Sequence, residues 1–397
     1  MTPDDDLPYR FGRSERRGLV VGWRPGQALA AAAAVGALLL GLGATAAPGV
    51  AAGVVSAILL AVVAVVPVRG RGIDEWAPVV ACFLARPRRG ALCAGAAVVD
   101  ASGAAPAHLR WPDGTATCVA MLGGAGLRAL SDEPRAVGEA LAAWLRTLGA
   151  PGASARTTSL LTTTGPGVPP RDARWAGGGM AAAALVAVSS SDPVDVASEL
   201  RAVGIDGVEP LGVPALESML AARVAPTAGT ILGCETVARW RLLEAPASVH
   251  AAFLVEEWPA GDVDEQALAA LCVSRDRRTV ALHLSVEELG RARERVATAR
   301  TKAAADASIA EGGGFLASPR AALEHARDAE RAAELAAGHG AVRLVGVIAI
   351  DAIDVLALEV AAARLVADAA GAGIRLRRCD GDHRRGVLST VPGWCVP

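Results

Sequence analysis

The chain has 397 residues, enough for two or three domains, and a formal net charge of −2 at pH 7. A chain so close to neutrality has no global electrostatic attraction to nucleic acid or to anionic lipid. Aromatic residues make up only 3% of the chain, so aliphatic side chains must build the core.

The seven cysteines are scattered, odd in number and free of any C-x-x-C pair. A disulfide framework and a zinc site are therefore not expected. This cysteine usage fits a reducing compartment, with the thiols acting as small core hydrophobes.

A long apolar segment opens the chain, because no charged residue stands between Arg24 and Arg69. A membrane helix needs about 20 apolar residues, so this segment has room for two spans. The pattern predicts a transmembrane hairpin at 27–68, with spans at about 27–47 and 50–68, after a basic cytoplasmic N-terminus at 1–26. Proline and glycine between the spans predict a tight turn.

Arginines flank both predicted spans and are absent from the turn, so the positive-inside rule places both termini in the cytoplasm. The chain is thus expected to be a multi-pass protein of the plasma (inner) membrane. The residues predicted to anchor and orient the hairpin are Arg16, Arg17, Trp23, Arg24, Pro48, Gly49, Arg69, Arg71 and Trp76.

Two other interpretations of this segment remain open. Arg16-Arg17 before an apolar run, and Ala44-Thr45-Ala46 after it, are typical of a cleaved signal peptide. The segment could also be a buried helical hairpin of a soluble domain. The second apolar run that follows at once favours an anchor over a signal peptide.

The rest of the chain predicts α+β domains. A juxtamembrane helix and a first α+β domain are expected at 73–150, and a linker rich in Gly, Pro, Ser and Thr at 151–178. The clearest patterns lie in 179–397, where strand and helix signals alternate. Their order predicts a ferredoxin-like, split βαβ arrangement with a helical insertion at 287–338.

Individual elements of this last part carry distinct signals. Apolar residues alternate from Arg278 to Val286, as in a half-buried strand. Ser318-Pro319 is typical of a helix start. An apolar strand is expected at 342–350 and a helix at 351–370, closed by glycine.

No catalytic constellation is evident. The sequence has no P-loop, no H-E-x-x-H and no G-x-S-x-G motif, and its six histidines lie far apart. Glu256 and Glu257 are adjacent on a predicted strand, so they are expected to point to opposite faces. We therefore expect no enzyme activity and no catalytic, cofactor-binding or metal-binding residue. Acidic residues interleave the basic helix at 291–302, so no sequence-specific nucleic-acid binding is expected.

Short motifs at both ends resemble a known family. They are Tyr9-Arg10-Phe11-Gly12, Glu15-Arg16-Arg17-Gly18, Val66-Pro67-Val68-Arg69-Gly70-Arg71, Glu75-Trp76, Glu257-Trp258-Pro259, Arg278-Thr279-Val280, Glu334-Leu335-Ala336-Ala337-Gly338-His339 and Arg375-Leu376-Arg377-Arg378. They resemble actinobacterial integral membrane proteins associated with conjugative, type IV secretion-like machinery. In that family the start is similar to a PrgI-like two-helix component, and the remainder is similar to the non-ATPase N-terminal domain of the secretion motor.

The resemblance implies a non-enzymatic, membrane-anchored structural subunit of a secretion or conjugation apparatus. Its expected partners are the lipid bilayer, an ATPase supplied in trans and other membrane subunits, in a hetero-oligomer. The type VII secretion membrane component with two N-terminal helices shares this layout and is the alternative family. A membrane-tethered enzyme and a secreted protein are the alternatives of other classes.

Overall fold

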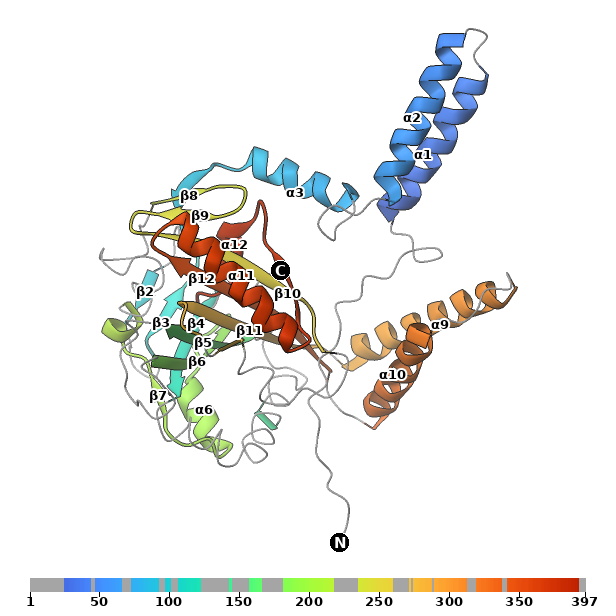
Figure 1. Ribbon diagram of the computed structural model, residues 1–397. Helices are drawn as coiled ribbons and strands as arrows, with labels where there is room; N and C mark the ends of the chain where they lie inside the picture. The colour runs from blue at the N-terminus through green and yellow to red at the C-terminus, as the bar shows by residue number, and fades with distance from the viewer. Residues whose placement is uncertain are drawn as a thin grey trace. The chain divides into compact units, whose positions relative to one another are not determined.

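The computed structural model describes fourteen stretches of the chain. They are 25–43, 47–65, 73–92, 97–100, 106–122, 143–144, 157–165, 181–217, 235–259, 271–272, 274–287, 289–312, 319–337 and 341–392. In these stretches the chain divides into two compact units (Figure 1). The first holds Arg88–Glu294 and Glu334–Pro397, and the second holds Ser14–Pro87 and Arg295–Ala333.

The first unit is built on an antiparallel sheet of 13 strands in the order β1-β8-β9-β10-β12-β11-β5-β6-β4-β3-β2, with β13 beside β10 and β7 beside β4. The strands are β1 Arg89–Ala91, β2 Ala97–Val99, β3 His108–Arg110, β4 Ala116–Leu122, β5 Thr157–Gly165, β6 Ala181–Ser190, β7 Val208–Pro210, β8 Glu235–Ala238, β9 Leu243–Ala245, β10 Ser248–Glu257, β11 Arg278–Glu287, β12 Ala341–Ala352 and β13 Arg375–Arg378.

The middle of the sheet consists of long strands with continuous pairing. Strand β11 pairs with β12 from Arg278↔Ile350 to Glu287↔Ala341, and on its other side it pairs with β5. Because side chains of a strand alternate between faces, this register places Val280 and Ile348 on one face and Ala281 and Val347 on the other. Both faces are buried here, so both carry apolar residues.

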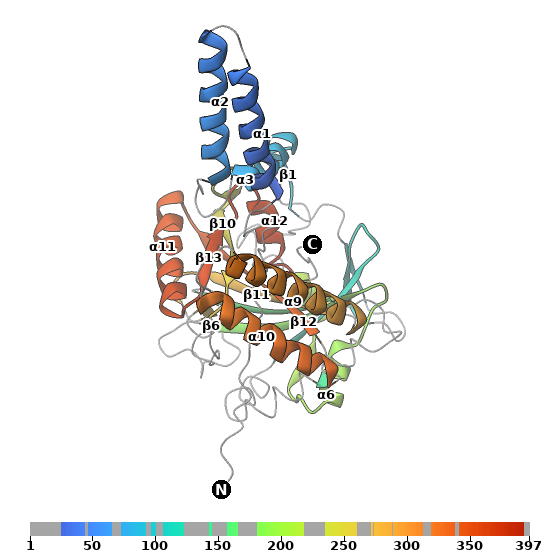
Figure 2. The ribbon, with the colours of Figure 1, turned by 90° about the vertical axis from the view of Figure 1, so that its right-hand side faces the viewer.

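Helix α11, Val355–Gly371, covers one face of these strands and packs against β10, β12 and β13. Figures 1 and 2 show it on the outside of the sheet. The core between helix and sheet includes Phe253 of β10, Ile348 and Ile350 of β12, and Leu358 and Leu365 of α11. The helix is therefore fixed along its full length by buried aliphatic packing.

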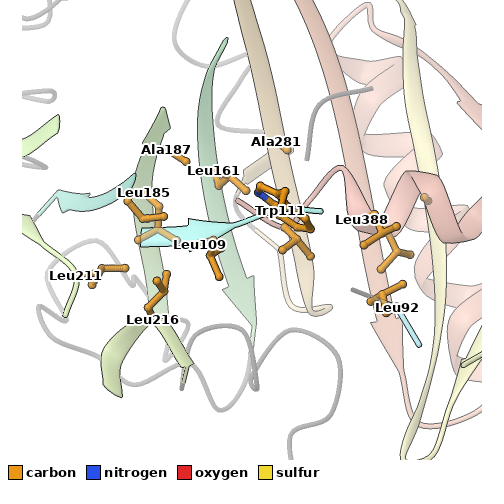
Figure 3. Packing of buried hydrophobic residues seen from close by; sticks show 14 of the residues in the cluster. Leu92, Leu109, Trp111, Leu161, Leu185, Ala187, Leu211, Leu216, Ala281 and Leu388 are labelled. Atoms are coloured by element: carbon orange, nitrogen blue, oxygen red, sulfur yellow. The ribbon is translucent and has the colours of Figure 1, made fainter. Parts of the chain in front are cut away.

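A second core fills the opposite face, where helix α12, His383–Leu388, packs on β10 and β12. Figure 3 shows its large side chains, among them Trp111, Leu161 and Leu388, which come from distant parts of the chain. The indole Nε1 of Trp111 donates a hydrogen bond to Oγ1 of Thr117 at 3.0 Å, which satisfies a buried polar group.

A third core lies under helix α6, Val196–Ala202, on strands β4 and β6. Asp195 caps this helix, because its side chain accepts a hydrogen bond from the Ser198 backbone N–H at 3.0 Å. The Trp144 indole donates to Glu199 at 3.0 Å and ties a neighbouring segment to the helix.

The second unit contains helices α1 Pro25–Leu42, α2 Ala47–Val65 and α3 Ile73–Ala85. Helices α1 and α2 approach closely, since a Cβ added at Gly41 would lie 2.7 Å from the Cα atom of Gly53. Helices α9 Leu289–Gly312 and α10 Pro319–Ala336 each cross the division between the units. The Arg293 guanidinium joins the start of α9 to the end of α10 by donating to the Leu335 carbonyl at 2.8 Å.

Among the described residues, none of the helices combines the length and the apolar character that a membrane crossing requires. Helix α1 has 18 residues, which span about 27 Å at about 1.5 Å per residue, against about 30 Å of hydrocarbon. Much of α1 is alanine, which is only weakly apolar. The predicted transmembrane hairpin at 27–68 is therefore wrong, and so is the predicted multi-pass membrane localisation with cytoplasmic termini.

The predicted ferredoxin-like architecture is also wrong. The chain is an α+β protein, but its strands join one large antiparallel sheet instead of separate split βαβ domains. Part of the stretch predicted as a linker, Thr157–Gly165, forms β5 in the middle of that sheet. Threonine is β-branched and favours strands, so the Thr-rich composition of this segment supports pairing on both of its sides.

Candidate docking site

Helix α11 carries apolar side chains on the side that faces away from the sheet. Its buried side consists of Leu358, Ala361, Ala362, Leu365 and Ala369. The opposite side presents Leu356, Val360, Ala363 and Ala367, which follow one another at helical spacings of three and four. Together with Ile353, just before the helix, these residues form what we call the outer face.

The outer face is open to solvent despite its composition. Ile353 is 84% exposed, Leu356 is 77% exposed and Val360 is 44% exposed. Single exposed apolar residues are common, but a continuous row on one helix marks an interaction surface. Full burial of one such side chain stabilises a complex by about 1.5–3 kcal/mol.

The helix that bears this face is held in place at its start. Asp354 is the N-cap residue, and its carboxylate accepts a hydrogen bond from the Ala357 backbone N–H at 2.8 Å. Because the buried side is packed and the N-terminus is capped, the outer face is preorganised and needs no ordering when a partner binds.

One edge of the outer face, here called the first flank, contains Arg241, Glu359 and Arg378. Arg378 donates to the Glu359 carboxylate at 2.9 Å, and Arg241 donates to the same oxygen at 3.3 Å. The hydrogen bond from Arg378, and the positive charge of both arginines, lower the pKa of Glu359. Asp380, which is buried, lies 4.0 Å from the Arg378 guanidinium, so the first flank is electrically balanced.

The other edge, here called the second flank, is a polar pocket of about 400 Å³ lined by Ser274, Arg275, Asp276, Arg278, Arg364 and Asp368. Arg278 is 1% exposed and donates to the Asp368 carboxylate at 2.9 Å. Arg364 projects from α11 and donates to Asp276 at 2.9 Å. Three arginines against two aspartates give the second flank a net positive charge.

Two arginines of the second flank remain available to a ligand. Arg364 is 58% exposed and uses one of its N–H donors on Asp276. Arg275 is exposed and, within the part of the chain that the structure describes, has no ion-pair or hydrogen-bond partner. The Ser274 hydroxyl accepts from the Asp276 backbone N–H at 3.1 Å, so its own proton can be donated.

The expectation for Glu256 and Glu257 is wrong. A register shift between β10 and β13 lies at Val255–Glu257, and such irregularities turn side chains away from strict alternation. Both carboxylates consequently contact Arg375, Glu256 at 3.2 Å and Glu257 at 2.9 Å. Arg377 approaches Glu256 at 3.3 Å. The pair forms a charge network with arginines rather than an acid and a base facing a cavity.

Three side chains lie in the order that serine hydrolases use. The hydroxyl of Ser248 is 2.9 Å from Nε2 of His250, and Nδ1 of His250 is 2.7 Å from the Asp351 carboxylate. Pairing of His250 with Asp351 across β10 and β12 creates this row. Arg277 lies 3.4 Å from the other Asp351 oxygen. The sequence gave no motif for it, because the three residues meet only through strand register.

The row lacks one part of a catalytic site. Acyl transfer needs backbone N–H groups that are free to bind an oxyanion beside the nucleophile. Ser248 pairs with Ala245 of β9, and Val249 pairs with residues of both β9 and β12. Backbone donors around the hydroxyl are thus used by the sheet, so the row is suited to fixing the β10–β12 register.

The residues predicted to orient a membrane hairpin are not brought together. Arg16, Arg17, Trp23, Arg24, Arg69 and Arg71 lie outside the described residues. Pro48 and Gly49 belong to the first turn of α2, not to a loop, because α2 begins at Ala47. Trp76 lies on α3 with its side chain half-buried.

Metal chemistry is not suggested by the arrangement. Over the described stretches, no group of three His, Cys, Asp or Glu side chains is placed to hold an ion. Cys82, Cys118, Cys272 and Cys379 are free thiols. Burial raises the pKa of the Cys118 and Cys272 thiols, which keeps them protonated and unreactive.

Sequence reasoning missed the outer face, although a signal for it exists. Within Val355–Gly371 the only charged residues are Glu359, Arg364 and Asp368. A helix that is apolar on nearly all sides is covered on all sides, either within its own fold or by a partner. That pattern could have indicated a second contact surface on α11.

Comparison with known proteins adds no identity. No family model matches this chain, and no curated protein matches it. The resemblance to secretion and conjugation proteins therefore stays a prediction.

Proposed function

We propose that this chain is a structural subunit that docks a partner protein through the outer face of α11. The observation that carries the proposal is the row of exposed apolar side chains on a helix that is otherwise capped and packed. A rigid apolar face of this kind binds without ordering cost and has no role in a chain that works alone. The motif resemblance supports a secretion or conjugation assembly, with an ATPase supplied in trans as the docked partner.

The proposal gives the protein a mechanical role. A chain that lacks a P-loop can serve an energised assembly if it holds the ATPase by protein contacts. Helix α11 is joined to the sheet by buried packing against β10, β12 and β13, so force on the outer face passes directly to the sheet.

Paired variants in the native host test the docking role. Leu356→Asp places a charge on the outer face at a position that is exposed, so the fold should persist. We expect this variant to lose the co-purifying ATPase and to lose transfer activity. Ala202→Asp, on exposed α6, is the matched control and should keep both. Full partner recovery and transfer with Leu356→Asp would overturn the proposal.

A serine acyl-transfer enzyme is the second candidate function, favoured by the row Ser248–His250–Asp351 alone. In that role His250 would take the proton of the Ser248 hydroxyl, and Asp351 would orient the imidazole. Covalent labelling by a fluorophosphonate probe tests it, with Ser248→Ala as the control. Labelling that disappears in Ser248→Ala would establish this candidate, and absence of labelling would dismiss it.

A further inference from the structure

The chemistry around the outer face restricts what can bind there. Its apolar row runs from Leu356 to Ala367, about 17 Å at about 1.5 Å per residue, which matches three turns of a second helix. Large side chains lie at the start of the row and the small Ala363 and Ala367 follow. A partner helix can therefore bring its own large residues close to α11 at these alanines.

A second copy of this chain is a poor occupant in either orientation. Parallel pairing of two α11 helices would set Leu356 against Leu356 and Ala367 against Ala367, which crowds one end and leaves a gap at the other. Antiparallel pairing would solve the packing, but a two-fold axis then brings each edge against the same edge of the other copy. The net positive second flank, including Arg364, would meet itself.

The second flank is suited to a carboxylate. Arg275 has no partner among the described residues, and Arg364 keeps N–H donors that are directed to solvent. Guanidinium groups bind carboxylates by paired N–H donors, and the Ser274 hydroxyl can add a further bond. On the first flank, the Glu359 carboxylate is already bound by Arg378 and Arg241, so it offers little repulsion to an acid.

We propose that the outer face binds an amphipathic α-helix of the partner whose apolar residues pack on Leu356, Val360 and Ala363 and whose acidic residues border that apolar side. A carboxylate of this helix enters the second flank and is bound by Arg275 and Arg364. The inference rests on the proposed docking function and specifies the chemistry of the docked segment.

Two synthetic peptides of about 18 residues test the charge preference on the purified full chain. Both carry the same leucine row at helical spacing, and the residues beside it are glutamate in one and lysine in the other. Fluorescence anisotropy is read at about 50 mM and about 300 mM NaCl. We expect the glutamate peptide to bind about tenfold more tightly at low salt, with a smaller difference at high salt.

Variants locate the binding site. Arg275→Glu reverses a charge that has no partner to lose, so it should weaken the glutamate peptide about fivefold and strengthen the lysine peptide. Arg201→Glu on α6 is the matched control and should change neither. Leu356→Asp should abolish binding of both peptides.

Each contrary result has a separate meaning. Equal or tighter binding of the lysine peptide, still abolished by Leu356→Asp, overturns the acidic helix and leaves the docking face intact. Absence of binding by both peptides up to about 1 mM overturns the inference, while partner recovery from the native host decides on docking itself. A dimer in sedimentation that Leu356→Asp dissociates identifies a second copy as the occupant and overturns the inference.

Discussion

The ion pair between Arg278 and Asp368 should respond unequally to removal of its two members. Arg278 is 1% exposed, whereas Asp368 is 43% exposed. Without Asp368, the guanidinium stays buried with only the Leu271 carbonyl, at 3.3 Å, as a printed acceptor in the described structure. An unpaired buried charge of this kind costs about 3 kcal/mol, so Asp368→Ala should lower the free energy of unfolding by about that amount.

Removal of the arginine has a smaller effect. In Arg278→Met the Asp368 carboxylate is half-exposed and can be hydrated, and the methionine fills the space of the aliphatic stem. The lost hydrogen bonds cost about 1 kcal/mol each, and release of the buried charge offsets part of this loss. We expect Arg278→Met to cost about 1 kcal/mol, and the double variant to resemble it.

Urea unfolding monitored by tryptophan fluorescence measures these differences on the full chain. The double-mutant cycle should give a coupling of about 2 kcal/mol between the two sites. If Arg278→Met lowers the free energy of unfolding as much as Asp368→Ala, or more, the reasoning from unequal burial is refuted.

Three further predictions follow from packing and burial. Gly41→Ala should separate α1 from α2, because its Cβ would lie 2.7 Å from the Gly53 backbone, and faster amide exchange in both helices would report it; exchange as slow as in the wild type would contradict the close approach. Gly386→Ala should destabilise by about 1–3 kcal/mol, since its Cβ meets that of Ala252, and Ala252→Gly should restore part of the loss in urea unfolding; a neutral Gly386→Ala would refute the contact. Burial lowers the pKa of His283 to about 4, so the unfolded chain takes up its proton near pH 6.5 while the folded chain does not, and stability is lost as pH falls from 6.5 towards 4. From pH 7 to 5 the wild type should lose about 2 kcal/mol more than His283→Gln, and equal losses would contradict the buried neutral imidazole.

Elements with strong local patterns were predictable from the sequence. The alternation from Arg278 to Val286 is confirmed by β11, and the helix start at Ser318-Pro319 is confirmed by α10, which begins at Pro319. The apolar strand at 342–350 lies within β12, and the helix at 351–370 is α11. In each case the period of apolar residues, or a capping residue, determines the local structure.

Pairing between distant segments was not predictable. Strand β5 joins β11 through the register Arg278↔Thr164, and no local feature of either segment specifies that neighbour. The same limit hid the row Ser248–His250–Asp351 and the irregularity that turns Glu256 and Glu257 towards Arg375. The absence of charge from 25–68 was over-interpreted, because apolar composition alone does not supply the length that a membrane span needs.

The site was predictable only in part. Apolar residues on both sides of α11 indicate two contact surfaces, but which side is covered by the sheet depends on long-range packing. The arginines of the second flank come from the β11 approach and from α11, so their convergence also required the fold.

Photo-crosslinking at position 356 tests the docking account most directly. A photoreactive amino acid in place of Leu356 stands on the outer face, and the same residue in place of Ala202 provides the control. After irradiation in the native host, mass spectrometry identifies the attached protein and the attached segment. The account predicts crosslinks at position 356 to an acidic amphipathic helix of one partner protein, and none at position 202. Absence of any crosslink at position 356, or equal crosslinking at both positions, would contradict it.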